Sequence, residues 1–269
     1  MAAALTGCAS VDVWVRERVY KPQTLTASEW QAGLARLGHT ADTVPGPAGD
    51  VQLLVARPTL VRADAPAVLY LHGTYRHALG NAAKLKPMVD AGWTVYAPDY
   101  RGWGASAPGL PDEAGIHADT WAVWQHISER HSRWLIVGHS MGTAVAAQLA
   151  ARLGEAPELC GVVLESGFPS FARVAAFSSG VLGVGVTALG RQRMDTAAAA
   201  RQLRVPVWVW HGERDRTIDL ALGRELFDAA AGDKHWETWP MDHSNLQDDP
   251  TGRYAQRWRE LAARCSTRP

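Results

Sequence analysis

The sequence predicts an α/β fold, built on a single, mostly parallel, twisted sheet with helices on both faces. Short apolar runs alternate with helical patterns through most of the 269 residues. Some of these runs, such as Pro66 to His72, are apolar almost throughout, as expected for strands that are buried on both faces. A chain of this length commonly forms one α/β domain and can bury a large core.

The expected elements follow one another in strand–helix order. Strands are expected at residues 51–57, 66–72, 93–98, 134–138, 161–165, 207–210 and 235–239. Helices are expected at residues 78–91, 112–131, 141–153, 217–231 and 250–264. Pro111 and Asp112 open the second of these helices, and Gly154 ends the third. Right-handed crossovers wind such a chain into one open sheet, whose ligands bind at the carboxyl ends of the strands.

Two segments fall outside this alternation. Residues 168–204 contain a Gly/Val/Ser-rich patch (178–190) followed by an alanine run, and they fit either a small cap over the site or a plain crossover helix. Residues 1–24 are interpreted as an N-terminal tether. The α/β domain is then expected to span residues 25–269.

Charge and cysteine content exclude several function classes. The chain has 27 basic and 27 acidic residues, so no basic face points to nucleic acid. No run of 18 apolar residues predicts a membrane span. Cys8, Cys160 and Cys265 lack metal-ligand spacing. Cys160 and Cys265 could pair in an oxidising compartment, but two unpaired thiols are the simpler interpretation.

The N-terminus carries a possible targeting signal. Residues 5–8 read LTGC and resemble a bacterial lipobox, in which the cysteine carries lipid. A lipidated Cys8 predicts membrane attachment in the periplasm, and without it the protein is expected in the cytoplasm. The match is incomplete, because seven residues precede Cys8 and none of them is basic.

The segment from Gly138 to Gly142 (GHSMG) matches the G-x-S-x-G pattern. An apolar strand precedes it and an alanine-rich helix follows, which is the setting that this motif requires. Small residues two positions before and after the serine allow a strained turn that pushes the hydroxyl out of the sheet. Ser140 is therefore the predicted nucleophile, and His139 beside it is expected simply to pack.

A serine hydroxyl needs an adjacent base to become a nucleophile, and the base needs an acid to orient it. Three histidines follow Ser140 in the chain. His243 lies in a polar loop after a strand and is the predicted base. His211 is interpreted as a turn residue, and His235 opens a strand.

The acid is assigned by position. Asp215 lies just beyond strand 207–210, which fits the order serine, acid, histidine found in this fold. Glu165 ends the preceding strand and is the alternative acid, since its carboxylate could reach the same histidine. Asp219 belongs to the start of a helix, and Asp242 adjoins the base and points elsewhere.

Acyl transfer also requires donors for an oxyanion. One is expected to be the backbone N–H of Met141, directly after the nucleophile. The other is expected to be the backbone N–H of Thr74, in the loop after strand 66–72. His72, at the end of that strand, is interpreted as a buried structural residue.

Five segments together resemble the small Bem46-like or serine-aminopeptidase-domain α/β hydrolases, many of which are known only as esterases. They are LYLHGT (69–74), PDYRGWGAS (98–106), VGHSMG (137–142), VPVWVWHGERD (205–215) and DHSN (242–245). The resemblance covers roughly residues 50–264 and implies an α/β-hydrolase fold with a minimal cap. The site residues that it implies are a triad of Ser140, Asp215 and His243, the oxyanion amides of Thr74 and Met141, and a structural loop with Asp99, Arg101, Gly102 and Gly104.

The sequence departs from this family at two places. Asp242 stands before the histidine, where relatives often have glycine. The loop after Gly73 reads TYRH (74–77) and is bulkier and more basic than usual. These departures leave the preferences of the acyl and leaving-group pockets open.

Taken together, these features predict a serine hydrolase of the carboxylesterase type (EC 3.1.1). It is expected to cleave small esters of short to medium acyl chain through an acyl-enzyme on Ser140. This chemistry needs no metal or organic cofactor. A peptidase, thioesterase or acyltransferase on the same triad is an alternative, as is a catalytically idle binding module of the cell envelope. The oligomeric state is not predicted.

Overall fold

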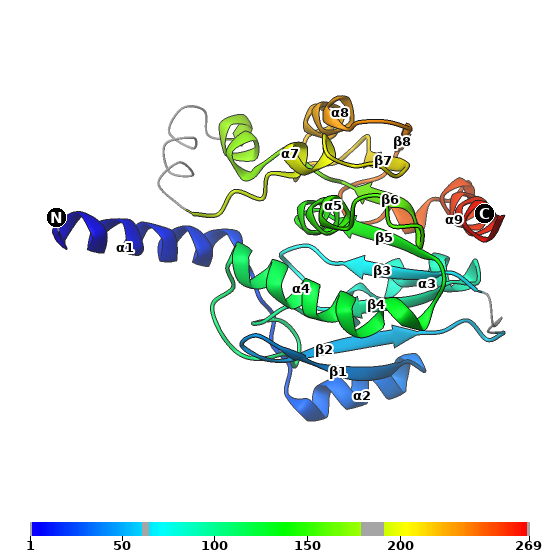
Figure 1. The fold of residues 1–269 in the computed structure, drawn as a ribbon, viewed down its shortest axis with the longest axis horizontal. Helices are drawn as coiled ribbons and strands as arrows, with labels where there is room; N and C mark the ends of the chain where they lie inside the picture. The colour runs from blue at the N-terminus through cyan, green and yellow to red at the C-terminus, as the bar shows by residue number, and fades with distance from the viewer. Residues whose placement is uncertain (1, 61–64, 179–190, 268–269) are drawn as a thin grey trace.

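The computed structural model describes residues 2–60, 65–178 and 191–267. Within them, eight strands form one sheet in the order β1-β2-β4-β3-β5-β6-β7-β8 (Figure 1). Strand β2 pairs antiparallel with both β1 and β4, and the other neighbouring strands pair in parallel. The strands are β1 (Thr40–Gly46), β2 (Gly49–Ala56), β3 (Ala67–Leu71), β4 (Thr94–Pro98), β5 (Trp134–His139), β6 (Leu159–Glu165), β7 (Val207–Gly212) and β8 (Lys234–Trp239). The predicted mostly parallel sheet is confirmed.

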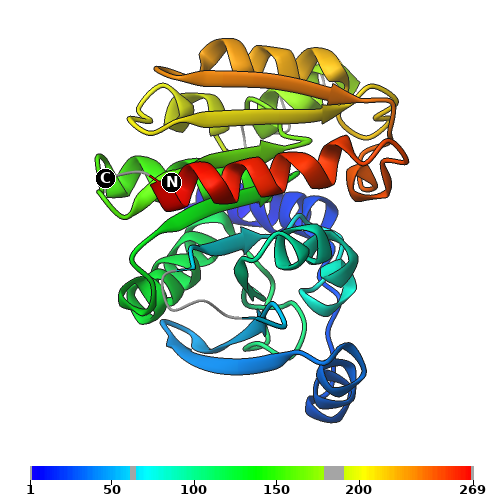
Figure 2. The same cartoon turned by 90° about the vertical axis from the view of Figure 1, so that its right-hand side faces the viewer.

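Helices cover both faces of the sheet, as Figures 1 and 2 show. Side chains of α4, α5, α7 and α8 join the core cluster on one face, and those of α2, α3 and α9 join the cluster on the other. The bounds of the helices are α1 (Ala2–Val19), α2 (Ala27–Leu37), α3 (Ala82–Asp90), α4 (Glu113–Ile127), α5 (Gly142–Leu153), α7 (Thr196–Ala200), α8 (Leu220–Ala229) and α9 (Arg253–Thr267). None of the described helices is long and apolar enough to cross a membrane.

An aromatic cluster fastens α9 to the last two parallel strands. The ring of Trp210 lies edge-on to those of Trp239, Tyr254 and Trp258, with centroids 5.0 to 5.5 Å apart. All four side chains are buried. Edge-to-face packing of large rings adds to the free energy gained from burying their area.

A disulfide also links α9 to the sheet. Cys160 of β6 and Cys265 of α9 are bonded, with their Cα atoms 5.4 Å apart. The interpretation of these residues as two unpaired thiols was therefore wrong. The two cysteines are 105 positions apart in the sequence and meet because α9 packs across the face of the sheet to which Cys160 points.

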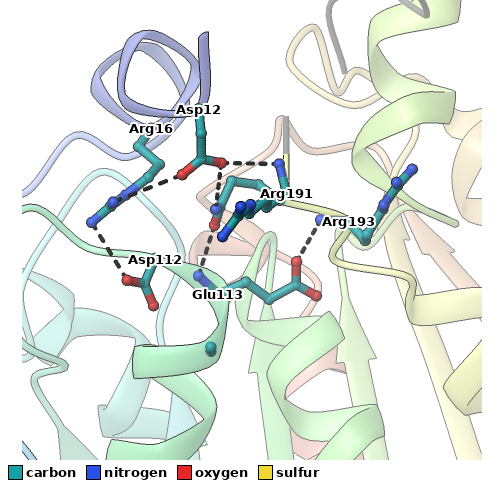
Figure 3. A pocket seen from close by; sticks show the side chains of 8 residues that line it. Asp12, Arg16, Asp112, Glu113, Arg191 and Arg193 are labelled. Carbon is teal, nitrogen blue, oxygen red and sulfur yellow. Dashed lines mark hydrogen bonds and ion pairs between the residues drawn. The ribbon is translucent and has the colours of Figure 1, made fainter. Parts of the chain in front are cut away.

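The predicted N-terminal tether is largely helical. Helix α1 extends beyond the sheet, and its second half is attached to the rest of the chain by polar contacts (Figures 1 and 3). Asp12 accepts hydrogen bonds from the Arg191 amide at 2.9 Å and from the Gln192 side chain at 3.1 Å. Arg16 donates to the carbonyl of Pro111 at 2.7 Å. Helix α1 is thereby joined to the segment before α7 and to the loop before α4.

The segment expected to form a cap or a crossover is described only in part. Residues 171–178 are helical, and α7 follows at Thr196–Ala200. Residues 179–190, which make up most of the Gly/Val/Ser-rich patch, lie outside the described residues. The choice between cap and crossover stays a prediction.

Candidate active site

Strands β3 to β8 run in one direction, so their carboxyl ends lie at one edge of the sheet. The predicted catalytic side chains follow three of these strands. Ser140 comes directly after β5, Asp215 follows β7, and His243 follows β8. Chain segments more than 100 residues apart in sequence therefore meet where ligands of parallel sheets usually bind.

Ser140 occupies a strained turn between β5 and α5. Its φ is 55°, in the left-handed region that residues other than glycine rarely adopt. The glycine two residues before it, Gly138, has no room for a side chain, because a Cβ there would overlap the backbone of Gly142. This turn holds the Ser140 side chain at the edge of the sheet.

His243 is paired with Asp215. The His243 Nδ1 atom lies 2.7 Å from Asp215 Oδ2, and the Asp215 side chain is fully buried. Burial by itself raises the pKa of Asp215, but hydrogen bonds from His211, His243 and the Ile218 amide outweigh it and hold the pKa well below its usual value. Asp215 is therefore ionised and fixes the tautomer in which His243 Nδ1 carries a proton.

A second histidine faces the same carboxylate. His211, near the end of β7, is fully buried, and its Nε2 lies 2.9 Å from the Ile218 carbonyl and 3.3 Å from Asp215 Oδ2. Both neighbours are acceptors, so Nε2 carries the proton. His211 is a buried donor that positions the acid, which the interpretation as a turn residue missed.

Two further side chains hold the His243 loop. The backbone carbonyl of His243 lies 3.0 Å from His139 Nε2 and accepts a hydrogen bond from Ser166 Oγ at 3.0 Å. Both His139 and Ser166 are buried. His139 thus fastens the loop of His243 to the segment that carries Ser140, beyond the simple packing that was expected.

The predicted oxyanion donors, the amides of Thr74 and Met141, belong to two segments that adjoin Ser140. The loop that carries Thr74 reaches Ser140 closely, since a Cβ on Gly73 would lie 3.1 Å from the Ser140 Cβ. Among the described residues, neither the Thr74 amide nor the Met141 amide has a protein acceptor. Two unpaired N–H groups beside a serine match the requirement for an oxyanion hole.

The loop carrying Thr74 is held from three sides. The Trp103 indole donates to the Thr74 carbonyl at 3.1 Å. The Asn81 side chain donates to the carbonyls of Arg76 and His77 at 3.2 and 3.0 Å. Asp99 accepts from the amide of Ala78, one residue after His77, at 2.6 Å. This loop (residues 73–78) is called the oxyanion loop below.

The segment with Asp99, Arg101, Gly102 and Gly104 lies beside the oxyanion loop. The guanidinium group of Arg101 binds Asp119 of α4 through two hydrogen bonds, of 2.9 and 2.6 Å. Gly104 has a φ of 55°, and a Cβ there would overlap the Asp99 carboxyl group. The segment therefore braces Asp99, which in turn holds the oxyanion loop.

Glu165, the alternative acid, is directed to other partners. Its two carboxylate oxygens lie 3.0 Å from Lys84 Nζ and 2.6 Å from the Tyr254 hydroxyl. All three side chains are buried. The structure thus brings Asp215, and not Glu165, to His243.

Ser140 and His243 line one cavity of about 350 Å³ at the carboxyl edge of the sheet. Within the described part of the chain, no hydrogen bond joins the Ser140 hydroxyl to the His243 ring. Such bonds are often long in free enzymes and tighten when substrate binds. The lining residues are Gly73, Thr74, Tyr75, Arg76, Asn81, Lys84, His139, Ser140, Thr217, His243 and Ser244.

Fold and site together define an α/β protein with a serine on a strand-to-helix turn and a His–Asp pair beside it. Several known proteins are similar to this chain. Residues 63–182 match the family model "Serine aminopeptidase, S33". The lysophosphatidylserine lipase ABHD12 of Danio rerio is 32% identical over 187 residues, which cover 63% of this chain and 48% of the relative. Human protein ABHD12B is 32% identical and matched over 63% of this chain and 51% of its own. The chain thus spans about half the length of these relatives.

Solved structures agree on the fold. The Pyrococcus furiosus esterase Pf2001 superimposes with a TM-score of 0.71 at 15% identity, covering 92% of this chain and 97% of the esterase. Est1E of Butyrivibrio proteoclasticus, solved with ferulic acid bound, gives a TM-score of 0.68 at 15% identity over 84% of this chain and 99% of its own. The chain has the fold of the α/β hydrolases.

Proposed function

We propose that this protein is a serine hydrolase that cleaves carboxylic esters of short to medium acyl chain. The observation that carries the proposal is the 2.7 Å contact between His243 and the buried Asp215, in a cavity that also contains Ser140. A base held by an ionised acid beside a serine is what nucleophilic acyl transfer requires.

The reaction would proceed in two steps. Ser140 Oγ attacks the ester carbonyl while His243 accepts its proton, and the oxyanion is bound by the amides of Thr74 and Met141. His243 then protonates the leaving alcohol. Water attacks the acyl-enzyme with His243 again as base, which releases the acid and restores Ser140. Throughout, Asp215 orients the imidazole and stabilises its charged form.

Several observations favour esters over amides, although the same triad serves both. One relative is named as a lipase and one structural neighbour as an esterase. The matching family model, in contrast, is named for an aminopeptidase. A cavity of about 350 Å³ is near the lower end for ligand sites and suits a short acyl chain. Peptidase, thioesterase and acyltransferase activities stay as alternatives.

The first test is labelling with a fluorophosphonate, together with hydrolysis of p-nitrophenyl acetate, butyrate and octanoate. The wild type should label and should hydrolyse the shorter esters. The variant Ser140→Ala should not label, and its kcat should fall by at least about 10⁴-fold.

Two outcomes would contradict the proposal. Turnover confined to long-chain lipids or amides would reject short- and medium-chain esters as substrates. A folded wild type that neither labels nor hydrolyses any ester would favour the catalytically idle binding module.

We also propose that Cys8 carries lipid and attaches the protein to the periplasmic side of a bacterial membrane. The proposal rests on the LTGC sequence at residues 5–8. Two acyl chains on one cysteine would suffice for stable anchoring. The mass of the protein purified from membranes of its own host tests this, because an unmodified Cys8 would reject it.

A further inference from the structure

One charged side chain in the catalytic cavity has no role in the mechanism above. Arg76 is exposed and lines the same cavity as Ser140 and His243. In the part of the chain that the structure describes, no carboxylate or carbonyl is bonded to its guanidinium group. A guanidinium group at the wall of a cavity presents several N–H donors in a fixed planar arrangement.

Arg76 gives the cavity a positive charge that no neighbouring carboxylate in the described part of the chain balances. Among the described residues, no aspartate or glutamate lines the cavity. Lys84, the other long basic side chain there, is buried and paired with Glu165 at 3.0 Å. Asp215, the ionised partner of His243, is fully buried and does not line the cavity in the described part of the chain. The cavity is therefore built to attract a negative charge toward Arg76.

The backbone of Arg76 is held in place relative to the oxyanion hole. Arg76 follows Thr74 by two residues, so their Cα atoms are at most about 7 Å apart. The Asn81 side chain binds the Arg76 carbonyl, and Trp103 binds the Thr74 carbonyl. A substrate whose ester carbonyl lies at Thr74 would thus have Arg76 within reach of a nearby substituent.

Arginine side chains also line a second site, where carboxylates balance their charges. Arg191 and Arg193 border another hollow, between α1 and α4 (Figure 3). Three carboxylates line it as well: those of Asp12, Asp112 and Glu113. That hollow is electrically compensated, whereas the catalytic cavity is not. Arg191 of this hollow is therefore a suitable control.

We propose that Arg76 is a specificity-determining residue that binds a negatively charged group, a carboxylate or a phosphate, on the ester substrate. The proposal rests on the proposed esterase function and narrows its substrate class to anionic esters. Bonds between arginine and carboxylate or phosphate are charge-assisted and frequently bidentate, which gives both affinity and orientation.

Two matched pairs of esters test the proposal. The first pair is p-nitrophenyl butyrate and mono-p-nitrophenyl succinate, which differ by a carboxylate on the acyl chain. The second is 1-butyrylglycerol and its 3-phosphate, which differ by a phosphate on the leaving alcohol. The wild type should show higher kcat/KM for the anionic member of at least one pair, and ionic strength of about 1 M should reduce this preference.

The variants then assign the preference to one side chain. Arg76→Gln should lower kcat/KM for the preferred anionic ester by about 10- to 100-fold and change that for its neutral partner by less than about twofold. Arg76→Lys should be intermediate, because lysine keeps the charge and loses the planar group of donors. Arg191→Gln, the control, should leave both values unchanged.

The results also separate this inference from the function on which it rests. Hydrolysis of the neutral esters without a preference for anionic ones, or an equal effect of Arg76→Gln on both members of a pair, would overturn the role of Arg76 alone. A folded wild type with no hydrolysis of any ester and no fluorophosphonate labelling would overturn the proposed function, and this inference with it.

Discussion

Among the carboxylates near the cavity that Ser140 and His243 line, Asp215 faces an unusual number of donors. Its Oδ1 atom accepts from the amides of Thr217 and Ile218 at 2.8 Å each. Its Oδ2 atom faces His243 at 2.7 Å and His211 at 3.3 Å. Each donor favours the ionised form of Asp215, and together they fix the direction in which the carboxylate points.

Glu165 and Asp215 should respond differently to removal of their charge. Asp215→Asn should lower kcat by about 10⁴-fold, because an amide can hold His243 in the wrong tautomer. Glu165→Gln should keep kcat within about threefold but lower the free energy of unfolding by about 3–5 kcal/mol, since Lys84 would be left buried and unpaired. Turnover of p-nitrophenyl butyrate and urea unfolding measure the two effects. A large loss of kcat in stable, folded Glu165→Gln would instead make Glu165 part of the catalytic machinery.

The predictability of the site differs from residue to residue. Ser140 is marked by a local pattern, and His243 and Asp215 by their positions after strands. Ser166 was not recognised, because its partner His243 comes from a distant loop. The role of His211 was missed although its partners follow it closely in the sequence. The four-residue spacing from His211 to Asp215 was visible in the sequence. The two side chains meet only because a turn folds Asp215 back onto β7, and the sequence alone does not show this turn.

At the scale of elements, the oxyanion loop depends on the end of β4. Asp99 is fully buried, and burial raises its pKa to about 7, although the hydrogen bond from the Ala78 amide lowers it. Its Oδ1 atom lies 3.5 Å from His72 Nε2. Burial lowers the pKa of His72 to about 4, so this histidine is neutral and offers Asp99 no positive charge at neutral pH.

This environment predicts a stability that depends on pH. The folded chain keeps the proton of Asp99 up to about pH 7, whereas the unfolded chain loses it at about pH 4. The contribution of the protonated Asp99 to stability is therefore fully present below about pH 4 and is lost as the pH rises through about 7. From pH 5 to pH 8, the free energy of unfolding in urea should fall more for the wild type than for Asp99→Asn. Parallel behaviour of the two proteins would contradict this.

Element prediction succeeded where strands are continuously apolar and failed at the N-terminal edge. Strand β1 was not predicted, because its sequence TADTVPG (40–46) is polar and contains a proline, and only Val44 is buried. Such a composition is tolerated at the edge of a sheet. Helix α2 was also missed, although Thr26 and Glu29 form a capping box that was readable in the sequence.

At the scale of the whole molecule, the disulfide closes a long covalent loop. Cys160 and Cys265 are 105 residues apart. A disulfide that closes a loop of about 100 residues stabilises the folded state by up to about 4.7 kcal/mol, because it lowers the entropy of the unfolded chain. Cys265→Ser, or reduction of the wild type, should lower the free energy of unfolding in urea by about 2–5 kcal/mol. Cys8→Ser is the control and should unfold like the wild type. Equal stability of all three proteins would show that the bond is not formed in solution.

The overall architecture was more predictable than the contacts between its distant parts. Alternating strands and helices, with short connections and right-handed crossovers, leave few possible sheet orders. The pairing of two cysteines depends instead on where α9 crosses the sheet. That placement is set by the ring packing of Trp210 with Tyr254 and Trp258, which no local pattern encodes.

The disulfide has one more consequence, for a chain that is cut by a protease. Ser140 precedes Cys160, while Asp215 and His243 lie between Cys160 and Cys265. A single cut between residues 166 and 206 would place Ser140 on one fragment and Asp215 and His243 on the other. Each fragment would still hold one end of the covalent link. A nicked molecule would thus migrate as one band on a non-reducing gel and as two after reduction, with Ser140, Asp215 and His243 retained in one particle.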